Sequence, residues 1–441
     1  MLDRIINILK ANKEISDWKI VQTITEAKEL FLIKKSIDMP RSKNIDNIEI
    51  TVYKDFEENG NKYRGSSIVT IPPTMTDEEI STSIKDAAFA ASFVKNEYYP
   101  LPSQSQHELN VVESKFDTAS LADWMSKIKD ALYKYDTNKN GYINATEIFL
   151  NKNNTSIINS KGISLSFKSY KGHIEFTTSW KEAGEEIELF QMIMFSDFDS
   201  EYISKSAQEM LEMSKEKAAT SPTPNLGSFA VILKGNPVAE ILKHYYLQSN
   251  AQYVYQHLST AKLNESIQGT DIKGDKINMV LDPAVNNSAA SEPVDNDGFE
   301  LTKHNIIKDG VLQKYWGTTQ YCHYLNVEPT GKISNMIFEG GSKTISEMRS
   351  EPYLEIAAFS DFQLNPMTGE FAGEIRLGWY FDGTNRITVS GGSISGHLNT
   401  LQNNMYLSKE LQQCLTQELF IPINYNGPKA IMLYNVSVAG N

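Results

Sequence analysis

Turn-forming dipeptides recur through the second half of the chain, and they constrain its fold more than any other feature. Between residues 226 and 441 they fall at Asp297-Gly298, Asp309-Gly310, Gly340-Gly341, Asp382-Gly383, Gly391-Gly392 and Asn426-Gly427. Such pairs are typical of tight reversals between short strands, because glycine accepts the positive φ that these turns need. Residues 226–441 are therefore predicted to form a large, β-rich, barrel-like antiparallel domain, with one late helix over Met405–Gln413.

The first half of the chain is predicted to divide into two α+β units. Residues 1–103 carry a short amphipathic helix, strands joined by a hairpin signal at Glu58-Asn59-Gly60-Asn61, and a second helix. Residues 108–220 place a helix on each side of a strand meander. A linker rich in serine and proline, Thr220–Asn225, precedes the barrel-like domain. The predicted fold class is α+β, with an N-terminal α+β half followed by the β-rich C-terminal domain.

Charge and cysteine content exclude several classes of function. The 441 residues include 55 acidic and 42 basic side chains, which gives a formal net charge of −13. Nucleic-acid binding is not expected, because a phosphate backbone requires a basic surface. The two cysteines lie far apart in the sequence, so they form no disulfide framework and fit a reducing compartment. No stretch has the roughly 18–20 apolar residues of a membrane span, and no signal peptide is evident, so a cytoplasmic protein without membrane partners is predicted.

A strand followed directly by a helix opens the C-terminal half. Ser228–Lys234 is apolar enough for a buried strand, while Asn236 and Pro237 suit the N-cap and first turn of a helix. One face of this helix is apolar with a period of 3.6 residues, and Glu240 and His244 lie one turn apart on the opposite face. A carboxylate and an imidazole placed in this way are candidates for a metal or acid–base site.

The donor set for a zinc peptidase is incomplete around these two residues. Catalytic zinc takes three protein ligands, commonly two histidines on one helix with a glutamate beside them. None of the seven histidines belongs to an HExxH or HExxxH arrangement. His244 is interpreted as an exposed surface residue, and Cys414, placed at the end of the late helix, as a partly buried structural one. Glu240 and His244 therefore remain the only catalytic candidates, and no cofactor is predicted in this chain.

One local motif matches a calcium-binding loop. It places oxygen ligands at Asp136, Asn138 and Asn140, a glycine at the sharp turn, and Glu147 at the twelfth position. Only the first and last of these side chains are charged, and no second loop pairs with this one. The alternative is a solvated Asn/Gly turn that enters a short helix. A calcium-binding protein is therefore kept as an alternative function.

Two further clusters have both a functional and a structural interpretation. Tyr245 and Tyr246 are candidates to line a peptide cleft, although packing in the core is the commoner role of such rings. The segment Asp295-Asn296-Asp297-Gly298 could present two carboxylates on one turn. Such a segment more often accepts hydrogen bonds from its own backbone and caps the turn.

The chain resembles the TldD/PmbA family, once called modulators of DNA gyrase. In the C-terminal half the similar segments follow the family's order: Ser228–Leu242, Asp295–Gly298, Asn305–Leu312, Thr330-Gly331, Phe338–Gly341, Thr368–Phe371, Ile394–Leu398 and Val436–Gly440. Upstream, similar segments match its first two domains: Tyr63–Gly65, Tyr99–Pro102 and Asn159–Gly162. The resemblance implies a dimeric peptidase for short or unfolded peptides, in which one subunit binds zinc through HExxxH and a distal cysteine while the other, PmbA- or TldE-like, lacks that motif.

This sequence departs from the zinc-binding pattern at the decisive helix. An alignment without gaps places Lys243-His244 on the HE pair and Gln248 on the second histidine. A shifted alignment, with Glu240 and His244 on the motif, leaves Ala239 at the first histidine. The ligand set is incomplete in both cases. The resemblance therefore implies a metal-free, PmbA/TldE-like subunit, with zinc expected on a TldD-like partner.

Two main functions remain open at this point. The first is a non-catalytic subunit that binds peptide beside a TldD-like zinc subunit. The second is a self-sufficient homodimer that binds or hydrolyses peptides through residues that the sequence does not identify. Only the first predicts a purified chain without stoichiometric zinc that gains peptidase activity when the partner is added.

Overall fold

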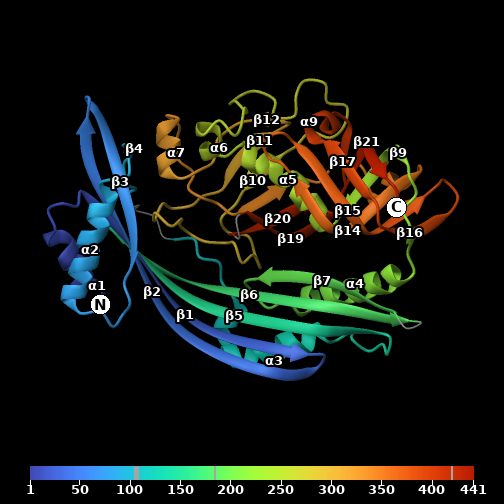
Figure 1. The fold of residues 1–441 in the computed structure, drawn as a ribbon, viewed down its shortest axis with the longest axis horizontal. Helices are drawn as coiled ribbons and strands as arrows, with labels where there is room; N and C mark the ends of the chain where they lie inside the picture. The colour runs from blue at the N-terminus through green and yellow to red at the C-terminus, as the bar shows by residue number, and fades with distance from the viewer. Residues whose placement is uncertain (104–108, 183–184, 419–420) are drawn as a thin grey trace.

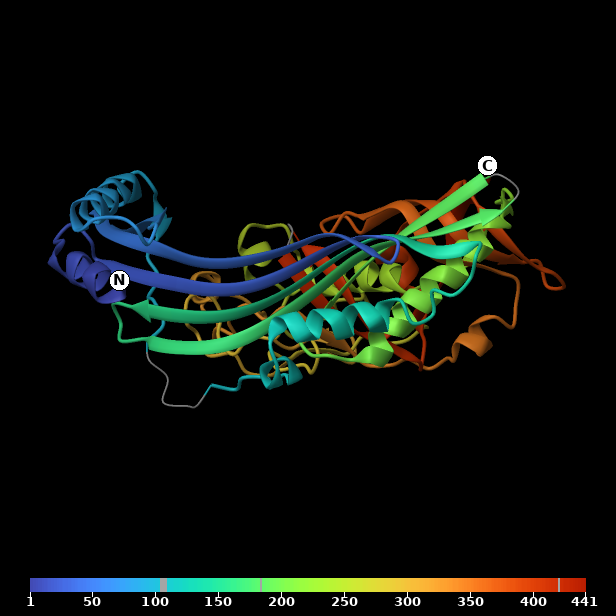
Figure 2. The same cartoon turned by 90° about the horizontal axis from the view of Figure 1, so that it is seen from below.

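The computed structural model describes residues 1–103, 109–182, 185–418 and 421–441. The first half of the chain forms a long curved sheet, and the second half forms a β-rich domain that lies over one end of it (Figure 1). Seen from below, the sheet extends well beyond the C-terminal domain on the side of the N-terminal helices (Figure 2). Within the described residues, no helix is both long and apolar enough to cross a membrane.

A single antiparallel sheet runs through both predicted N-terminal units. Its strand order is β4-β3-β2-β1-β5-β6-β7. The strands are β1 (Asp17–Ile33), β2 (Ser36–Glu58), β3 (Asn61–Thr70), β4 (Asn96–Glu97), β5 (Gly141–Asn159), β6 (Ser164–Glu182) and β7 (Glu185–Phe195). In the register, Ile20 lies opposite Ile50 on one side and Ile158 on the other. Because β1 pairs with β5 as well as with β2, residues 1–103 and 108–220 share one sheet instead of forming separate ones.

Helices cover the two ends of this sheet and make two separate cores. The helices are α1 (Leu2–Ala11), α2 (Asp77–Ala91), α3 (Leu121–Leu132) and α4 (Ser200–Ala218), with a 3₁₀ turn at Lys115–Thr118. Thr76 and Glu79 form a capping box that begins α2. The apolar faces of α1 and α2 pack on β1 and β2, whereas α3 and α4 pack against β5, β6 and β7. The α+β class predicted for this half is confirmed.

The C-terminal half contains a closed barrel, as the density of turns predicts. Neighbouring strands follow the order β14-β9-β21-β17-β15, and pairing of β14 with β15 closes the ring. The strands are β9 (Gly227–Lys234), β14 (Tyr353–Leu364), β15 (Glu370–Phe381), β17 (Ser393–His397) and β21 (Ala430–Ala439). The pairs are antiparallel except for β9 with β14, which is parallel. Three short strands extend this sheet: β8 (Ser221–Pro222), β16 (Arg386–Ser390) and β18 (Met405–Leu407).

A second sheet packs beside the barrel. Its order is β12-β11-β10-β13-β20-β19. The strands are β10 (Met279–Leu281), β11 (His304–Lys308), β12 (Val311–Leu312), β13 (Asn335–Phe338), β19 (Leu411–Glu418) and β20 (Ile421–Pro428). Short helices connect the strands: α6 (Ala251–Tyr255), α7 (Thr319–Tyr324), α8 (Ile345–Met348), α9 (Leu398–Leu401) and a 3₁₀ turn at Gln402–Asn404.

The helix predicted over Met405–Gln413 is wrong. Met405–Leu407 forms β18, which pairs with β21, and Leu411 begins β19, which pairs with β20. This segment has a local preference for helix. In the folded chain it lies beside strands that are distant in the sequence, and hydrogen bonding to them outweighs that preference.

Polar contacts join the sheet to the C-terminal domain. Lys19 on β1 binds Asp297 with 2.6 Å between Nζ and Oδ1, and Lys171 binds Glu292 at 2.7 Å. Asp295 accepts hydrogen bonds from the backbone N–H groups of Asp297 and Phe299 at 2.9 and 3.0 Å. The segment thus caps its own turn, as its structural interpretation predicts, and it also anchors the two halves of the molecule to each other.

Candidate functional site

The strand–helix unit lies at the centre of the C-terminal domain. Strand β9 ends at Lys234, and Gly235 turns the chain with a φ of 76° before α5 (Asn236–Gln248) begins. A positive φ favours glycine, so Gly235 is the N-cap, and Asn236, predicted for that role, is the first helical residue. Helix α5 packs against barrel strands β9 and β14 on one side and against β19 and β20 on the other. It is therefore enclosed by both sheets.

This enclosure buries the face of α5 that was predicted to be exposed. His244 is only 4% exposed, and its Nδ1 has no hydrogen-bond partner among the described residues. Burial, and then the charge of His397, lower the pKa of His244 to about 4. The imidazole is therefore neutral at physiological pH, and the interpretation of His244 as a surface residue is wrong.

Glu240 has a different environment from His244, although the two lie one turn apart. Its carboxylate reaches the surface of a cleft and pairs with Lys243 at 2.7 Å. Cys414 lines the same cleft from β19, not from the end of a helix as predicted. Burial, and then the negative charge of Glu240, raise the pKa of the Cys414 thiol to about 12. This thiol is therefore protonated at neutral pH and unsuited to act as a nucleophile.

The cleft has a volume of about 1010 Å³ and separates α4 and β7 from the C-terminal domain. Segments distant in sequence form its walls: 189–193 on β7, 357–362 on β14 and 411–415 on β19, together with the start of α5. Phe190 and Leu411 are 61% and 55% exposed in it and give the cleft part of its apolar surface. Sequence reasoning missed both, because no local pattern brings these segments together.

Charges are distributed unevenly over the walls of the cleft. Helix α4 contributes a row of carboxylates, Glu209, Glu212 and Glu216, at helical spacing. Strands of the C-terminal domain contribute Lys234 and Arg376. With apolar side chains between them, these groups offer contacts to both the charged and the apolar groups of a bound chain.

The residues around Glu240 do not fit a zinc site. In the shifted alignment the fully buried Ala239 stands where the first histidine of HExxxH would lie, and in the alignment without gaps Lys243 stands there. Glu240 and Cys414 are neighbours at the cleft, whereas the charge that perturbs His244 comes from His397. Throughout the described part of the chain, no group of three or more His, Cys, Asp and Glu side chains is placed to hold a metal ion. The donors present thus fall short of the three ligands that catalytic zinc requires.

Tyr245 and Tyr246, the predicted cleft residues, lie instead in the core. They are 0% and 2% exposed. The Tyr245 hydroxyl donates to Gln402 at 2.7 Å, and the Tyr246 hydroxyl donates to the carbonyl of Ile333 at 2.9 Å. The Tyr246 ring stacks on Trp316 with 4.2 Å between centroids. Packing, the commoner role of such rings, is the role they have here.

The structure does not assemble the predicted calcium loop. The short helix expected after the turn is replaced by β5, which begins at Gly141. Asp136 is buried and accepts a hydrogen bond from the backbone of Ile143, while Asn138 and Asn140 lie in the exposed turn. Glu147 lies four residues beyond Ile143 on the extended strand, or about 13 Å further along it. That distance is too long for Asp136 and Glu147 to bind one ion.

The comparisons with known proteins agree with this architecture. Residues 226–440 match the PmbA/TldA metallopeptidase C-terminal domain. The strand–helix unit, the barrel and the C-terminal side of the cleft thus lie in the part of the chain that matches this domain. The C-terminal half of the chain is thus a domain of the TldD/PmbA family.

Solved structures extend the likeness in fold to the whole chain. TldE from Thermococcus kodakarensis is 16% identical with a TM-score of 0.78, covering 99% of this chain and 100% of that one. A candidate modulator of a DNA gyrase from Thermotoga maritima is 17% identical with a TM-score of 0.77, covering 100% and 99%. A curated relative, the uncharacterized protein MJ0231 of Methanocaldococcus jannaschii, is 22% identical over 214 residues, which are 46% of this chain and 49% of that protein. The chain thus matches about half the length of this relative.

Proposed function

We propose that this chain is the metal-free, TldE-like subunit of a TldD/TldE-type metallopeptidase. It binds short or unfolded peptides in the cleft beside α5, while a TldD-like partner subunit supplies zinc. The observation that carries the proposal is the donor set of α5. Lys243 or Ala239 stands at the first histidine, depending on the alignment, and His244 is buried in the core. With the imidazole neutral and enclosed and the Cys414 thiol protonated, Glu240 is the only carboxylate of the motif that lines the cleft.

The walls of the cleft support peptide binding. Strands β7 and β19 are the outermost strands of their sheets, and both line the cleft. An extended peptide can add to such an edge through main-chain hydrogen bonds, with its side chains alternating between the two faces. Phe190 and Leu411 then provide apolar contacts for the side chains that point inward. These features suit a peptide of varied sequence, because the main chain supplies much of the contact.

Measurements of zinc content and peptidase activity test whether the partner subunit supplies the zinc. The purified chain is expected to contain no stoichiometric zinc by elemental mass spectrometry and to leave an unfolded peptide uncut. Adding a TldD-like subunit that carries HExxxH should produce peptidase activity and a heterodimer in size-exclusion chromatography. Stoichiometric zinc together with activity in the isolated chain would instead establish the self-sufficient homodimer.

A variant in the cleft tests where the peptide binds. Phe190→Glu places a charge among the apolar contacts and is expected to weaken binding of a fluorescently labelled unfolded peptide roughly tenfold in an anisotropy titration. Ile68→Glu is the matched control, because Ile68 is 66% exposed on β3 and lies outside the cleft. Equal affinities for the two variants and the unmodified chain would exclude this cleft as the peptide site.

A further inference from the structure

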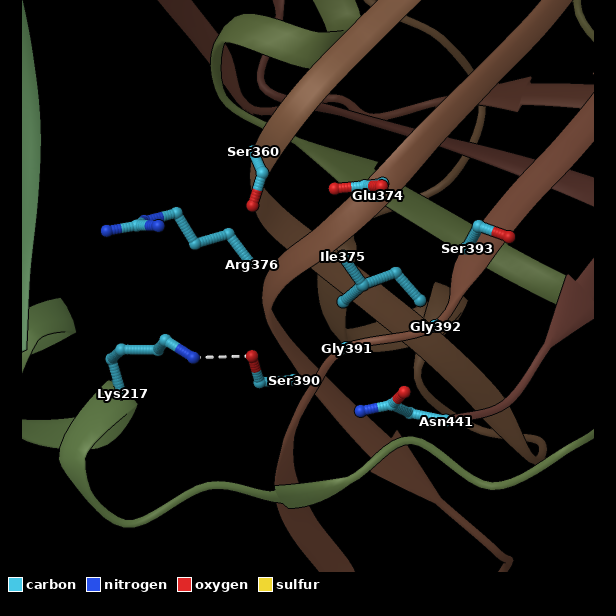
Figure 3. A pocket seen from close by; sticks show the side chains of 10 residues that line it. All are labelled: Lys217, Ser360, Glu374, Ile375, Arg376, Ser390, Gly391, Gly392, Ser393 and Asn441. Atoms are coloured by element: carbon cyan, nitrogen blue, oxygen red, sulfur yellow. Dashed lines mark hydrogen bonds between the residues drawn. The ribbon is translucent and has the colours of Figure 1, made fainter.

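A second cavity lies between the end of α4 and the edge of the barrel. It has a volume of about 440 Å³, and Figure 3 shows the side chains that surround it. Lys217 reaches into it from the last turn of α4, and Arg376 enters from β15. The hydroxyl groups of Ser360 on β14 and Ser390 on β16 complete its polar wall. Two cations and two hydroxyl groups thus line the cavity from elements that are distant in the sequence, with the Arg376 guanidinium directed toward β7 (Figure 3).

Both cations retain unused hydrogen-bond donors. Lys217 donates to Ser390 Oγ at 2.5 Å, which leaves further N–H groups of the ammonium available. Arg376 donates through Nη2 to the carbonyl of Glu188 at 2.6 Å, which fixes the guanidinium while its other N–H groups stay available. Within the described residues neither cation pairs with a carboxylate. An arginine held by a neutral carbonyl keeps its full positive charge for a ligand.

The electrostatic balance of the cavity favours an anion. Burial, and then the nearby charge of Arg376, lower the pKa of Lys217, as expected for two cations placed close together. Glu374 is the one acidic side chain among the described residues that line the cavity, and it is exposed. A bound anion would relieve the repulsion between the cations and form charge-assisted hydrogen bonds with both.

The cavity is continuous with the peptide cleft. Ser360 and Arg376 line both spaces, so the cavity lies directly beside the cleft. The bulged segment of β14 between Phe359 and Phe362 holds Ser360 at this junction. The terminal carboxylate or an acidic side chain of a peptide in the cleft is thus close enough to enter the cavity.

We propose that Lys217, Arg376, Ser360 and Ser390 form a subsite that binds the C-terminal carboxylate of a peptide lying in the cleft. This inference rests on the proposed peptide-binding function and names the end of the substrate that the chain recognises. The subsite fixes the direction of the peptide, with its C-terminus at the end of α4 and its upstream residues along β7, β14 and β19. A carboxylate fits the planar guanidinium through paired hydrogen bonds, and the ammonium adds a third contact.

A pair of peptides of one sequence tests the subsite. The unstructured peptide carries a fluorophore at its N-terminus and ends either in a free carboxylate or in an amide. The free acid is expected to bind the chain roughly tenfold more tightly than the amide, as one charge-assisted contact allows. Lys217→Gln and Arg376→Gln should each remove most of this preference for the free acid. Lys215→Gln, an exposed position on the same helix with the same change in charge, should keep the preference.

The possible outcomes distinguish a failure of the carboxylate subsite from a failure of peptide binding in the cleft. Equal binding of acid and amide would overturn the subsite and leave peptide binding intact. Absence of binding by both forms would overturn peptide binding, and the subsite with it. A preference that survives in both variants would exclude Lys217 and Arg376 as its cause. An amidated peptide that ends in Glu and binds as tightly as the free acid would overturn recognition of the C-terminus in favour of a side-chain carboxylate.

Discussion

The buried guanidinium of Arg64 is expected to stabilise the end of the long sheet on which α1 and α2 pack. Arg64 lies on β3 and is 0% exposed, and it binds Asp55 at 2.7 and 2.9 Å and Asp17 at 2.6 Å. Removing one partner from a buried ion pair costs about 3–5 kcal/mol, because the remaining charge stays buried. Asp17 keeps Lys161 at 2.7 Å and Ser160 at 2.6 Å, and Asp55 is 21% exposed. We therefore expect Arg64→Leu to cost about 3 kcal/mol, at the lower end of that range.

Amide hydrogen exchange measures the loss of stability caused by Arg64→Leu locally, in the strands around Arg64. It does not require that a chain with several cores unfolds in one step. A loss of about 3 kcal/mol should accelerate exchange of protected amides in β1, β2 and β3 roughly 150-fold, since 1.4 kcal/mol corresponds to a factor of ten. Arg4→Leu is the matched control, because Arg4 pairs with Asp77 at the surface, where the side chains are 45% and 69% exposed. That pair contributes under about 1 kcal/mol. Similar acceleration in both variants would refute the reasoning.

Three other predictions follow from burial and close packing. Burial, and then the charge of Asp297, raise the pKa of Asp295 to about 7 from a value of 3.8, so its contribution to the free energy of unfolding should fall as pH rises between about 4 and 7. In urea unfolding at several pH values, Asp295→Asn should reduce this dependence of the free energy of unfolding on pH. An unchanged pH dependence would contradict the raised pKa of Asp295. Burial raises the pKa of Cys322 to about 11 and that of Cys414 to about 12, so iodoacetamide at about pH 8 should label both thiols only after denaturation, as mass spectrometry would show. A Cβ at Gly65 would lie 1.9 Å from the carbonyl oxygen of Ala91, so Gly65→Ala should displace α2 and lower stability by about 1–3 kcal/mol; an unchanged melting temperature would argue against this contact.

Local turn chemistry predicts much of the C-terminal fold correctly. Asp309-Gly310 joins β11 to β12, and Gly391-Gly392 joins β16 to β17. Asn426-Gly427, in contrast, lies inside β20, where a Cβ on Gly427 would lie 2.8 Å from the Tyr425 hydroxyl. Close packing within a strand and a tight turn both require glycine, so the dipeptide alone does not distinguish them.

The candidate site was predictable only in part. The period of α5 predicts its apolar face, but His244 lies on the polar face and is buried as well, because a second sheet encloses the helix. That sheet includes β19, which the sequence presents as part of a helix. The cleft and the cavity beside Lys217 could not be predicted either, because both form between segments that are distant in the sequence. Phe190 and Arg376, for example, line one cleft only because strands from different halves of the chain fold against each other.

The position of β21 within the barrel has a consequence for biosynthesis. This strand lies between β9, with which the barrel-forming sequence begins, and β17. During translation β9 must therefore wait for about two hundred further residues before its antiparallel neighbour leaves the ribosome. Until then β9 exposes an apolar edge, which is a hazard for aggregation. A nascent chain that stalls before Ala430 is thus expected to require a chaperone or to be degraded, whereas the long N-terminal sheet, whose strands are complete by Phe195, can form first.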